Sequence, residues 1–312
     1  IRQEHECGIF EMGMNRKNEI GEIANVLKPK YAIITNIGNA HIGLLGSREN
    51  IATEKRKIFE YLGKDGAAFI PVNDDFADFI TENVSGKIVK FGKSVSEKES
   101  KVSYKKSNGL FGTLFTLNGV EINLPISGEY NYQNALSAVA IAKELGVSDE
   151  EIKTGLENFR NVGGRMEVTK TVLCNGNDVT IVKDCYNANP DSMEKVIELC
   201  KDEENKGNKI FVLGDMKELG EKSEEEHREI YLKVTNYKVK ACFVGPEFKN
   251  AISKTNVKNP ESVLCDSVES PELKDFVLEN ANEDSLILLK GSNSMQLWNL
   301  LPKIEMKEQE GK

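Results

Sequence analysis

The first third of the chain alternates short apolar runs with segments of helical spacing. Residues 7–12, 31–37 and 66–73 have the composition of buried strands, whereas residues 18–27 and 47–62 place their apolar side chains along one helical face. Strands and helices that alternate in this way build a parallel sheet with helices packed on its faces. We therefore expect a βαβαβ arrangement at the start of the chain.

The pattern changes between residues 87 and 125. Short stretches of alternating apolar and polar residues predict strands joined as hairpins, and the Asn118-Gly119 pair is typical of a hairpin turn. Two helices are predicted after this region, at residues 130–146 and 148–159. The first half of the chain is therefore expected to hold both a parallel sheet and an antiparallel one.

The second half has the pattern of a doubly wound α/β sheet. Helical patterns separate most of its six apolar runs, which we interpret as strands. The six runs are residues 167–173, 179–184, 209–215, 240–245, 262–266 and 285–291. The predicted fold class is α/β, with one domain at residues 1–160 and a Rossmann-like domain at residues 161–312. Ligands bind beyond the carboxyl ends of the strands in such open sheets.

Composition narrows the class of protein. The chain has 312 residues, 39% of them hydrophobic, and a net charge of −9. The negative charge argues against a general nucleic-acid-binding protein, which needs a basic surface. No run of eighteen apolar residues predicts a membrane span, and no two of the six cysteines form a CxxC pair. We expect a cytoplasmic protein whose cysteines in apolar runs are buried and make no disulfide framework.

Three side chains near the start suggest a metal site. Glu11 follows the first predicted strand, His41 lies in the polar turn after the second, and Lys55 lies in the first turns of the next helix. Because the carboxyl ends of parallel strands meet at one edge of a sheet, Glu11 and His41 can together hold a divalent ion. The alternative is a loop histidine without a ligand and a glutamate that caps a helix. The other histidines, His5 and His227, lie in charged stretches that we expect to be solvated.

Candidate ligand contacts lie near the junction between the two halves. Asn131 and Asn134 stand at the start of a predicted helix, and a carboxamide can read the edge of a nucleobase. Helix capping is the alternative for both. Arg165 lies where the domains are expected to meet, so it can reach a phosphate across the interface. A surface salt bridge is the alternative for this arginine.

Two loops of the second domain are rich in hydrogen-bonding groups. The first follows a strand and carries Asp184, Asn187 and Asn189, which suit a ligand site and equally an ordinary polar loop. The second loop is a plausible cradle for a phosphate or a carboxylate. Its residues are Lys290, Gly291 and Ser292.

The order and spacing of the motifs resemble those of the Mur ligases of peptidoglycan synthesis. The motifs are "FEMGMNR…GEIANVLKP…AIITNIGNAHIGLLGSRENIATEK", "GEYNYQNALSAVAIA", "GGRMEV", "DCYNANPDSM", "VLGDMKELGE…H" and "LKGSNSM", and they span nearly the whole chain. The stretches "YNANP" and "LGDMKELG" are most similar to the member that joins D-alanyl-D-alanine to a UDP-N-acetylmuramoyl-tripeptide. By contrast, the chain has no GxxxxGK[ST] phosphate loop, no GxGxxG, no GxSxG and no HExxH.

The resemblance implies a three-domain ligase of which this chain holds two domains. Residues 1–160 would be the later part of the central ATP-binding domain, and residues 161–312 the Rossmann-like C-terminal domain. The first domain, which binds the UDP-sugar, and the phosphate-loop part of the central domain would be missing. We therefore expect that this chain alone does not turn over.

The resemblance also assigns roles to the candidate residues on the ATP side. Glu11 and His41 would bind magnesium near the ATP phosphates. Lys55 would join them as a third ligand after carbamylation, which converts its amine to an anion. Asn131 and Asn134 would contact the adenine. ATP and Mg²⁺ are thus the implied cofactors.

The remaining candidates would lie on the side of the C-terminal domain. Arg165 and Asp184 would reach ATP when the domains close. The peptide and dipeptide substrates would be bordered by Asn187, Asn189, Lys290, Gly291 and Ser292. The implied reaction converts the tripeptide carboxylate to an acyl phosphate, which the amine of D-alanyl-D-alanine then attacks.

The resemblance implies a monomer that acts on small molecules and binds neither nucleic acid nor membrane. Two alternatives stay open, namely a binding homologue without catalysis and a related amide ligase with a different amino acid acceptor. Three positions depart from the family pattern. Tyr130 replaces a histidine, Lys57 replaces an acid two residues after the lysine that is carbamylated, and Asn18 replaces a glycine.

Overall fold

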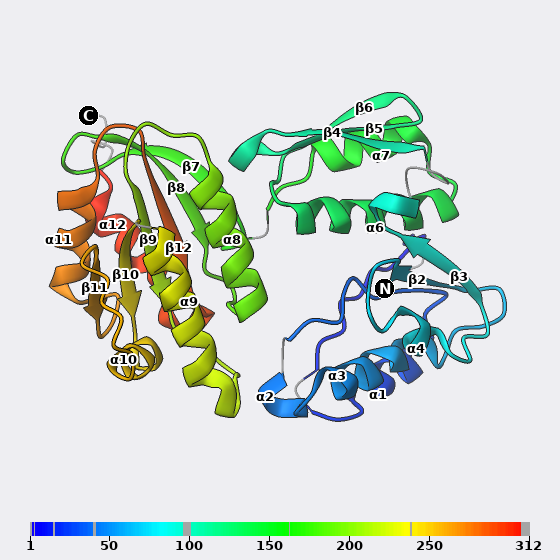
Figure 1. Cartoon of the computed structure of the whole chain (residues 1–312). Helices are drawn as coiled ribbons and strands as arrows, with labels where there is room; N and C mark the ends of the chain where they lie inside the picture. The colour runs from blue at the N-terminus through cyan, green and yellow to red at the C-terminus, as the bar shows by residue number, and fades with distance from the viewer. Residues whose placement is uncertain are drawn as a thin grey trace.

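The structure, a computed structural model, describes residues 2, 4–14, 16–39, 42–95, 101–161, 163–237 and 239–306. Its strands form three sheets, two of three strands each in the first half of the chain and one of six strands in the second. Figure 1 shows the six-stranded sheet with its helices on the left and the elements of the first half on the right. The α/β fold class predicted from the sequence is confirmed.

The first sheet is parallel and has the order β1-β2-β3. Its strands are β1 (Tyr31–Ile33), β2 (Ala67–Pro71) and β3 (Lys87–Phe91). The residues of β2 from Ala67 to Ile70 are all buried, because helices cover the central strand on both faces. The helices near this sheet are α1 (Glu19–Leu27), α2 (Ile42–Leu45), α3 (Arg48–Lys55) and α4 (Ala77–Thr81).

The strand predicted at residues 7–12 is wrong. These residues form no strand, and the side chains of Ile9 and Phe10 are 96% and 49% exposed. A strand needs a neighbour to pair its backbone N–H and C=O groups, and within the described residues the parallel sheet ends at β1. Glu11 therefore does not stand at the carboxyl end of a strand.

The second sheet is the predicted antiparallel one. Its strands β4 (Val102–Ser107), β5 (Thr113–Leu117) and β6 (Val120–Leu124) pair in the order β4-β5-β6. Asn118 and Gly119 have φ values of 50° and 87°, which is the left-handed pair that a two-residue hairpin turn requires. The expectation that residues 87–91 belong to this hairpin region is wrong, because β3 pairs with β2 in parallel.

Two helices, α6 (Glu129–Glu144) and α7 (Asp149–Glu157), follow the second sheet as predicted. The buried side of α6 joins the two sheets of the first half. Its Tyr132, Leu136 and Val139 belong to the core over the antiparallel sheet, while Ala140 and Ile141 pack on the side chains of β2 and β3.

The third sheet contains all six strands predicted for the second half. The order is β11-β10-β9-β12-β8-β7, and only β7 runs antiparallel to its neighbour. Its strands are β7 (Glu167–Val172), β8 (Asp178–Asp184), β9 (Lys209–Gly214), β10 (Lys240–Val244), β11 (Ser262–Cys265) and β12 (Ser285–Lys290). Every residue of β12 is buried, which explains its continuous apolar sequence.

Helices cover both faces of the six-stranded sheet (Figure 1). One face packs against α8 (Pro190–Asp202), α9 (Ser223–Tyr237) and α10 (Pro246–Ser253). The other packs against α11 (Pro271–Asn280) and α12 (Leu301–Ile304). Cys242 and Cys265 lie buried in this sheet, as predicted for cysteines in apolar runs. Among the described residues, no helix is both long and apolar enough to cross a membrane.

The first half contributes side chains to the core of the second. Leu110, in the turn between β4 and β5, is 2% exposed and lies among the residues of α8, α9 and the six-stranded sheet. Its backbone N–H donates a hydrogen bond of 2.9 Å to Glu203 Oε2, just beyond the end of α8. Tyr130 packs against the same core. Burial of a leucine contributes about 1.5–3 kcal/mol, so these contacts hold the halves together.

The expectation that His227 is solvated is wrong, although His5 is exposed as expected. The ring of His227 is fully buried on α9. Its Nε2 accepts a hydrogen bond of 2.9 Å from the backbone N–H of Met216, and its Nδ1 lies 2.6 Å from the carbonyl oxygen of Ser223, to which it donates. Burial lowers the pKa of His227, because the cationic ring loses its hydration. Asp215 and Glu247 oppose this effect and Lys217 adds to it.

We predict that His227 makes the stability of the chain depend on pH. Because the folded pKa lies below the usual value of about 6.5, the unfolded chain takes up the proton first as pH falls. His227 therefore contributes to the free energy of unfolding above about pH 6.5, its usual pKa, and this contribution is lost as the pH falls toward the folded pKa. Urea unfolding of the wild type and of His227→Gln between about pH 7.5 and 5.5 measures the effect.

The difference in the free energy of unfolding between these two proteins should shrink as the pH falls. His5→Gln, at an exposed position, is the control for the replacement of a histidine elsewhere in the chain. A constant difference for His227→Gln over the same range would contradict the prediction.

Candidate functional site

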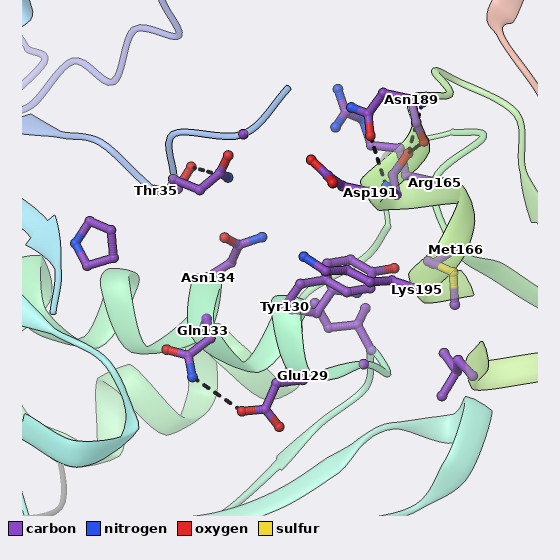
Figure 2. A pocket seen from close by; sticks show the side chains of 18 of the residues that line it. Thr35, Glu129, Tyr130, Gln133, Asn134, Arg165, Met166, Asn189, Asp191 and Lys195 are labelled. Atoms are coloured by element: carbon purple, nitrogen blue, oxygen red, sulfur yellow. Dashed lines mark hydrogen bonds between the residues drawn. The ribbon is translucent and has the colours of Figure 1, made fainter. Parts of the chain in front are cut away.

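A cavity of about 1100 Å³ lies between the two halves of the chain. One wall consists of residues that follow β1, β2 and β3, and the other of residues that follow β8 together with Lys290 at the end of β12. The start of α6 contributes to the wall between them, as Figure 2 shows. The carboxyl ends of two parallel arrays thus face one cavity, as expected for ligand sites in open α/β sheets.

The loop at residues 35–39, which follows β1, is fixed by three neighbours. Asp74 Oδ2 accepts a hydrogen bond of 2.7 Å from the N–H of Ile37, and Arg48 Nη2 donates one of 2.9 Å to the Ile37 carbonyl. Lys55 Nζ donates one of 2.8 Å to the carbonyl of Asn36. These contacts hold the polar loop against the cavity.

Lys55 is the last residue of α3, because the helix predicted at residues 47–62 ends there and continues as the 3-10 helix Arg56–Phe59. Burial lowers the pKa of Lys55, while the carboxylate of Asp74 opposes this effect. The lower pKa increases the fraction of neutral amine, which is the form that can react to a carbamate.

The predicted magnesium ligands are not brought together in the part of the chain that is described. His41 lies outside the described residues. Glu11 is exposed and does not line the cavity. Among the described residues, no group of three His, Cys, Asp or Glu side chains has the arrangement of a metal site. The metal role of Glu11, His41 and Lys55 therefore stays a prediction.

The two asparagines at the start of α6 have different surroundings. Asn131 Nδ2 donates a hydrogen bond of 2.7 Å to the carbonyl of Ser127, so this side chain fixes the turn before the helix. Asn134 makes no side-chain hydrogen bond to any described residue, and Figure 2 shows it extending from the helix into the cavity. Asn134 is thus the one of the two whose carboxamide is available to a ligand.

A buried ion pair lies at the carboxyl ends of β8 and β12. Lys290 Nζ lies 2.8 Å from Asp184 Oδ2, and their side chains are only 2% and 13% exposed. The same ammonium group donates to the carbonyl of Asn187 at 2.6 Å. Asp184 Oδ1 accepts a hydrogen bond of 3.2 Å from the N–H of Met166. The pair therefore ties β12 to the loop after β8 and to the segment before β7.

Arg165 and two residues at the start of α8 face the cavity together in Figure 2. The guanidinium of Arg165 lies over the ring of Tyr186, 4.2 Å from its centroid. Asn189 is the N-cap of α8 and accepts a hydrogen bond of 2.9 Å from the N–H of Ser192. Asp191 accepts one of 3.3 Å from the N–H of Asn39, which joins the two walls.

Gly291 and Ser292 do not line the cavity. A Cβ on Gly291 would lie 3.0 Å from the Cα of Gly214, so this glycine permits close packing of the ends of β12 and β9. Ser292 is 5% exposed, and its Oγ accepts a hydrogen bond of 2.9 Å from the N–H of Lys217. In this structure both residues support the end of β12.

Several cavity residues with ionisable side chains were not predicted from the sequence. Among them are Arg48, Asp74, Asp191 and Lys195. Asp74 comes shortly after β2, and Asp191 and Lys195 lie one helical turn apart at the start of α8. The rule that sites lie at the carboxyl ends of strands therefore could have found three of them. Arg48 begins the helix after the loop at residues 35–39 and carries no such signal.

Two of the three departures from the family pattern have a structural reason. Lys57 Nζ pairs with the buried Glu54 at 2.7 Å, and it does not line the cavity. Asn18 has a φ of 68°, a left-handed conformation for which glycine is favoured and asparagine is tolerated. The third departure, Tyr130, lines the cavity, and burial raises the pKa of its hydroxyl.

Two family models match the chain. The Mur ligase middle domain matches residues 1–142, and the Mur ligase, glutamate ligase domain matches residues 164–293. The chain belongs to the Mur ligase family. The resemblance stated from the sequence motifs is thereby confirmed.

Curated and solved relatives of this Mur ligase chain point to one branch of the family. It is 35% identical to the UDP-N-acetylmuramoyl-tripeptide–D-alanyl-D-alanine ligase of Treponema pallidum and 33% identical to that of Bacillus subtilis. These matches cover 97% and 94% of the chain, and 64% and 63% of the relatives. A crystal structure of MurF from Acinetobacter baumannii superposes with a TM-score of 0.83 at 28% identity, covering 97% of this chain and 65% of that one. The chain thus spans just under two thirds of the length of these relatives.

We predict that the Asp184–Lys290 pair of this Mur ligase chain is strongly coupled. Lys290→Met leaves a buried carboxylate without its cation, which costs about 3–5 kcal/mol of unfolding free energy. The double variant Asp184→Asn/Lys290→Met removes both charges, so it should cost clearly less than the sum of the single variants. Denaturant unfolding of the four proteins measures the coupling.

The exposed pair Lys249–Asp266 provides the matched control. Its side chains are 60% and 79% exposed, so Lys249→Met should cost less than about 1 kcal/mol. Additive costs for Asp184→Asn and Lys290→Met would contradict the coupling.

Proposed function

We propose that these two Mur ligase domains bind ATP and an acceptor dipeptide for a ligase that joins D-alanyl-D-alanine to a UDP-N-acetylmuramoyl-tripeptide. The observation that carries the proposal is the single cavity between the domains, which Asn134 lines from one side and Arg165 and Lys290 from the other. Relatives with this named activity match nearly the whole chain. A MurF ligase from Thermotoga maritima, 21% identical, is described in complex with ADP, which supports a nucleotide as the ligand.

The shape and charge of the cavity fit a nucleotide together with the end of a peptide. Its volume of about 1100 Å³ is at the upper end of the range for ligand pockets, roughly 300–1000 Å³. The free carboxamide of Asn134 suits the adenine edge, which needs a donor and an acceptor side by side. Arg165 and Lys195 can meet phosphates from the wall of the C-terminal domain, since no described residue forms an ion pair with either.

The residues of this chain contribute orientation and exclusion of water to the proposed reaction. A carboxylate of the peptide substrate must approach the terminal phosphate in line, and the positive groups of the cavity wall would hold both anions in reach. The dipeptide amine would then enter from the side of Asn187 and Asn189.

The substrates are small molecules, and we propose that the ligase acts as a cytoplasmic monomer. Mg²⁺ is the proposed companion of ATP, although the described residues form no ligand set for it.

We predict that Asn134→Ala weakens nucleotide binding without lowering stability. The side chain makes no internal hydrogen bond, so only contacts to the ligand are lost, and the affinity for ATP should fall roughly 5- to 10-fold. Isothermal titration with ATP and with ADP measures the affinity, and thermal unfolding measures the stability.

Asn131→Ala provides the contrast at the same helix end. Because its side chain holds the carbonyl of Ser127, this variant should lower the melting temperature. Asn250→Ala, on the exposed side of α10, controls for asparagine removal itself. Unchanged ATP affinity in Asn134→Ala would remove this residue from the proposed site, and no ATP binding by the wild type would refute the proposal.

We predict that residues 1–312 alone release no phosphate from ATP in the presence of both proposed substrates. The sequence has no GxxxxGK[ST] loop, so the triphosphate lacks its backbone cradle. A colorimetric phosphate assay with the tripeptide nucleotide and D-alanyl-D-alanine tests this expectation, and steady turnover would contradict it. Turnover that required another amine in place of D-alanyl-D-alanine would favour a related ligase with a different acceptor.

A further inference from the structure

The motif "LGDMKELG" helped to identify the family, but none of its residues lines the cavity. We call residues 215–220 the docking loop. It follows β9, in the centre of the six-stranded sheet, and leads into the short helix Gly220–Lys222 before α9. In this structure its contacts are with other parts of the protein and not with the cavity.

Two buried side chains fix the docking loop from within its own domain. Asp215 is fully buried and accepts hydrogen bonds from the backbone N–H groups of Glu247 and Phe248, at 3.2 and 3.1 Å, in the first turn of α10. His227, fully buried on α9, accepts the N–H of Met216. An anion at the helix start and a neutral ring acceptor therefore hold the loop on α9 and α10.

A third anchor connects the docking loop to β12. Ser292 Oγ accepts the N–H of Lys217 at 2.9 Å, and the N–H of Ser292 donates to the carbonyl of Asp215 at 3.1 Å. This reciprocal pair joins the loop to the segment that begins with Lys290. The docking loop thus has a fixed position relative to the acceptor wall of the cavity.

The outer part of the docking loop meets the other domain. Glu218 and Gly220 have φ values of 65° and 58°, and this left-handed turn brings their backbone against Gly43 of α2. A Cβ on Gly43 would lie 3.0 Å from the nitrogen of Gly220 and from the carbonyl carbon of Glu218, a distance that real Cβ atoms avoid. Gly43 therefore allows a backbone contact between the domains that no other residue permits without displacement.

This contact joins the two walls of the cavity on a second route. Helix α2 comes directly after the segment that contains the loop at residues 35–39, which lines the ATP side. The docking loop is fixed to the acceptor side. We propose that the docking loop sets the separation of the two walls by resting on Gly43, and that His227 is a positioning residue for the loop. The proposal concerns domain spacing and does not depend on the ligand.

The decisive variant is Gly43→Ala. The position is helical, so alanine fits the local backbone and the variant should still fold. Its methyl group would nevertheless displace the docking loop and with it the C-terminal domain. Leu44→Ala, at a 53% exposed position of the same helix, is the matched control without this contact.

Electron–electron distance measurements between spin labels report the separation directly. One label is placed by Lys64→Cys in the first domain and the other by Lys258→Cys in the second, in a background of Cys7→Ser and Cys174→Ser that removes the exposed thiols. Gly43→Ala should shift or broaden the distance distribution, and Leu44→Ala should leave it unchanged. An unchanged distribution in Gly43→Ala would overturn the proposal, as would an equal change in both variants.

The role of His227 is tested by two substitutions. His227→Ala removes the acceptor for the N–H of Met216 and should broaden the same distribution, whereas His227→Gln retains an acceptor and should restore it in part. A buried histidine that served only local folding would lower the melting temperature in His227→Ala without changing the interdomain distance. If His227→Ala does not fold, Gly43→Ala still decides the proposal.

Discussion

The cavity exists because two sheets are held with their carboxyl ends facing each other, and burial of apolar side chains between the two halves contributes to that arrangement. The side chain of Leu110, in the turn between β4 and β5, packs in the core between α8, α9 and the six-stranded sheet. Tyr130, at the start of α6, packs on the same core. Because both side chains would be exposed without the second domain, apolar burial of about 25 cal/mol per Å² favours the paired arrangement. The polar residues of the cavity depend on this arrangement for their proximity.

Burial of apolar side chains does not by itself fix the exact arrangement of the cavity walls. Polar contacts then determine that arrangement. Many ion pairs of the described residues have both side chains exposed, as in Lys249–Asp266, and such pairs contribute little because water competes for both charges. The pair of Lys290 and Asp184 differs, because both side chains are largely buried and each makes a further hydrogen bond. Removal of one partner would leave the other charge buried without its counter-ion. A single buried pair therefore matters more to the acceptor wall than the many pairs on the surface.

The sequence predicts those elements whose pattern is local. Strands β9, β10 and β12 of the second half are recognisable because they are buried among neighbours, so that apolar residues follow one another almost without a break. The turn at Asn118-Gly119 is recognisable because only a few residue pairs adopt its left-handed backbone. Residues 7–12 have the same apolar composition, yet no partner strand pairs with them among the described residues. Pairing is a nonlocal property, and composition alone does not reveal it.

The candidate site was predictable to a similar degree. Asp184 and Lys290 follow apolar strands, and the rule for carboxyl ends brings them to the cavity. The different surroundings of Asn131 and Asn134 could not be read from the sequence, because they depend on which side chain reaches Ser127. His227 did leave a signal, since Ile230, Tyr231 and Val234 follow it at helical spacing and are buried with it. The many charges on the other faces of α9 obscured that signal.

The position of α8 has a mechanical consequence. This helix contacts the first domain near both ends, through Glu203 and Leu110 at one end and through Asp191 and Asn39 at the other. Thirteen residues of helix span about 20 Å, so these contacts lie far apart. The end with the buried leucine resists separation more strongly than the other end, where Asn39 donates hydrogen bonds of 3.3 Å to Asp191 from its backbone N–H and its side-chain amide. A small rotation of α8 about Leu110 therefore moves the start of the helix, at the mouth of the cavity, farther than it moves the end next to Leu110.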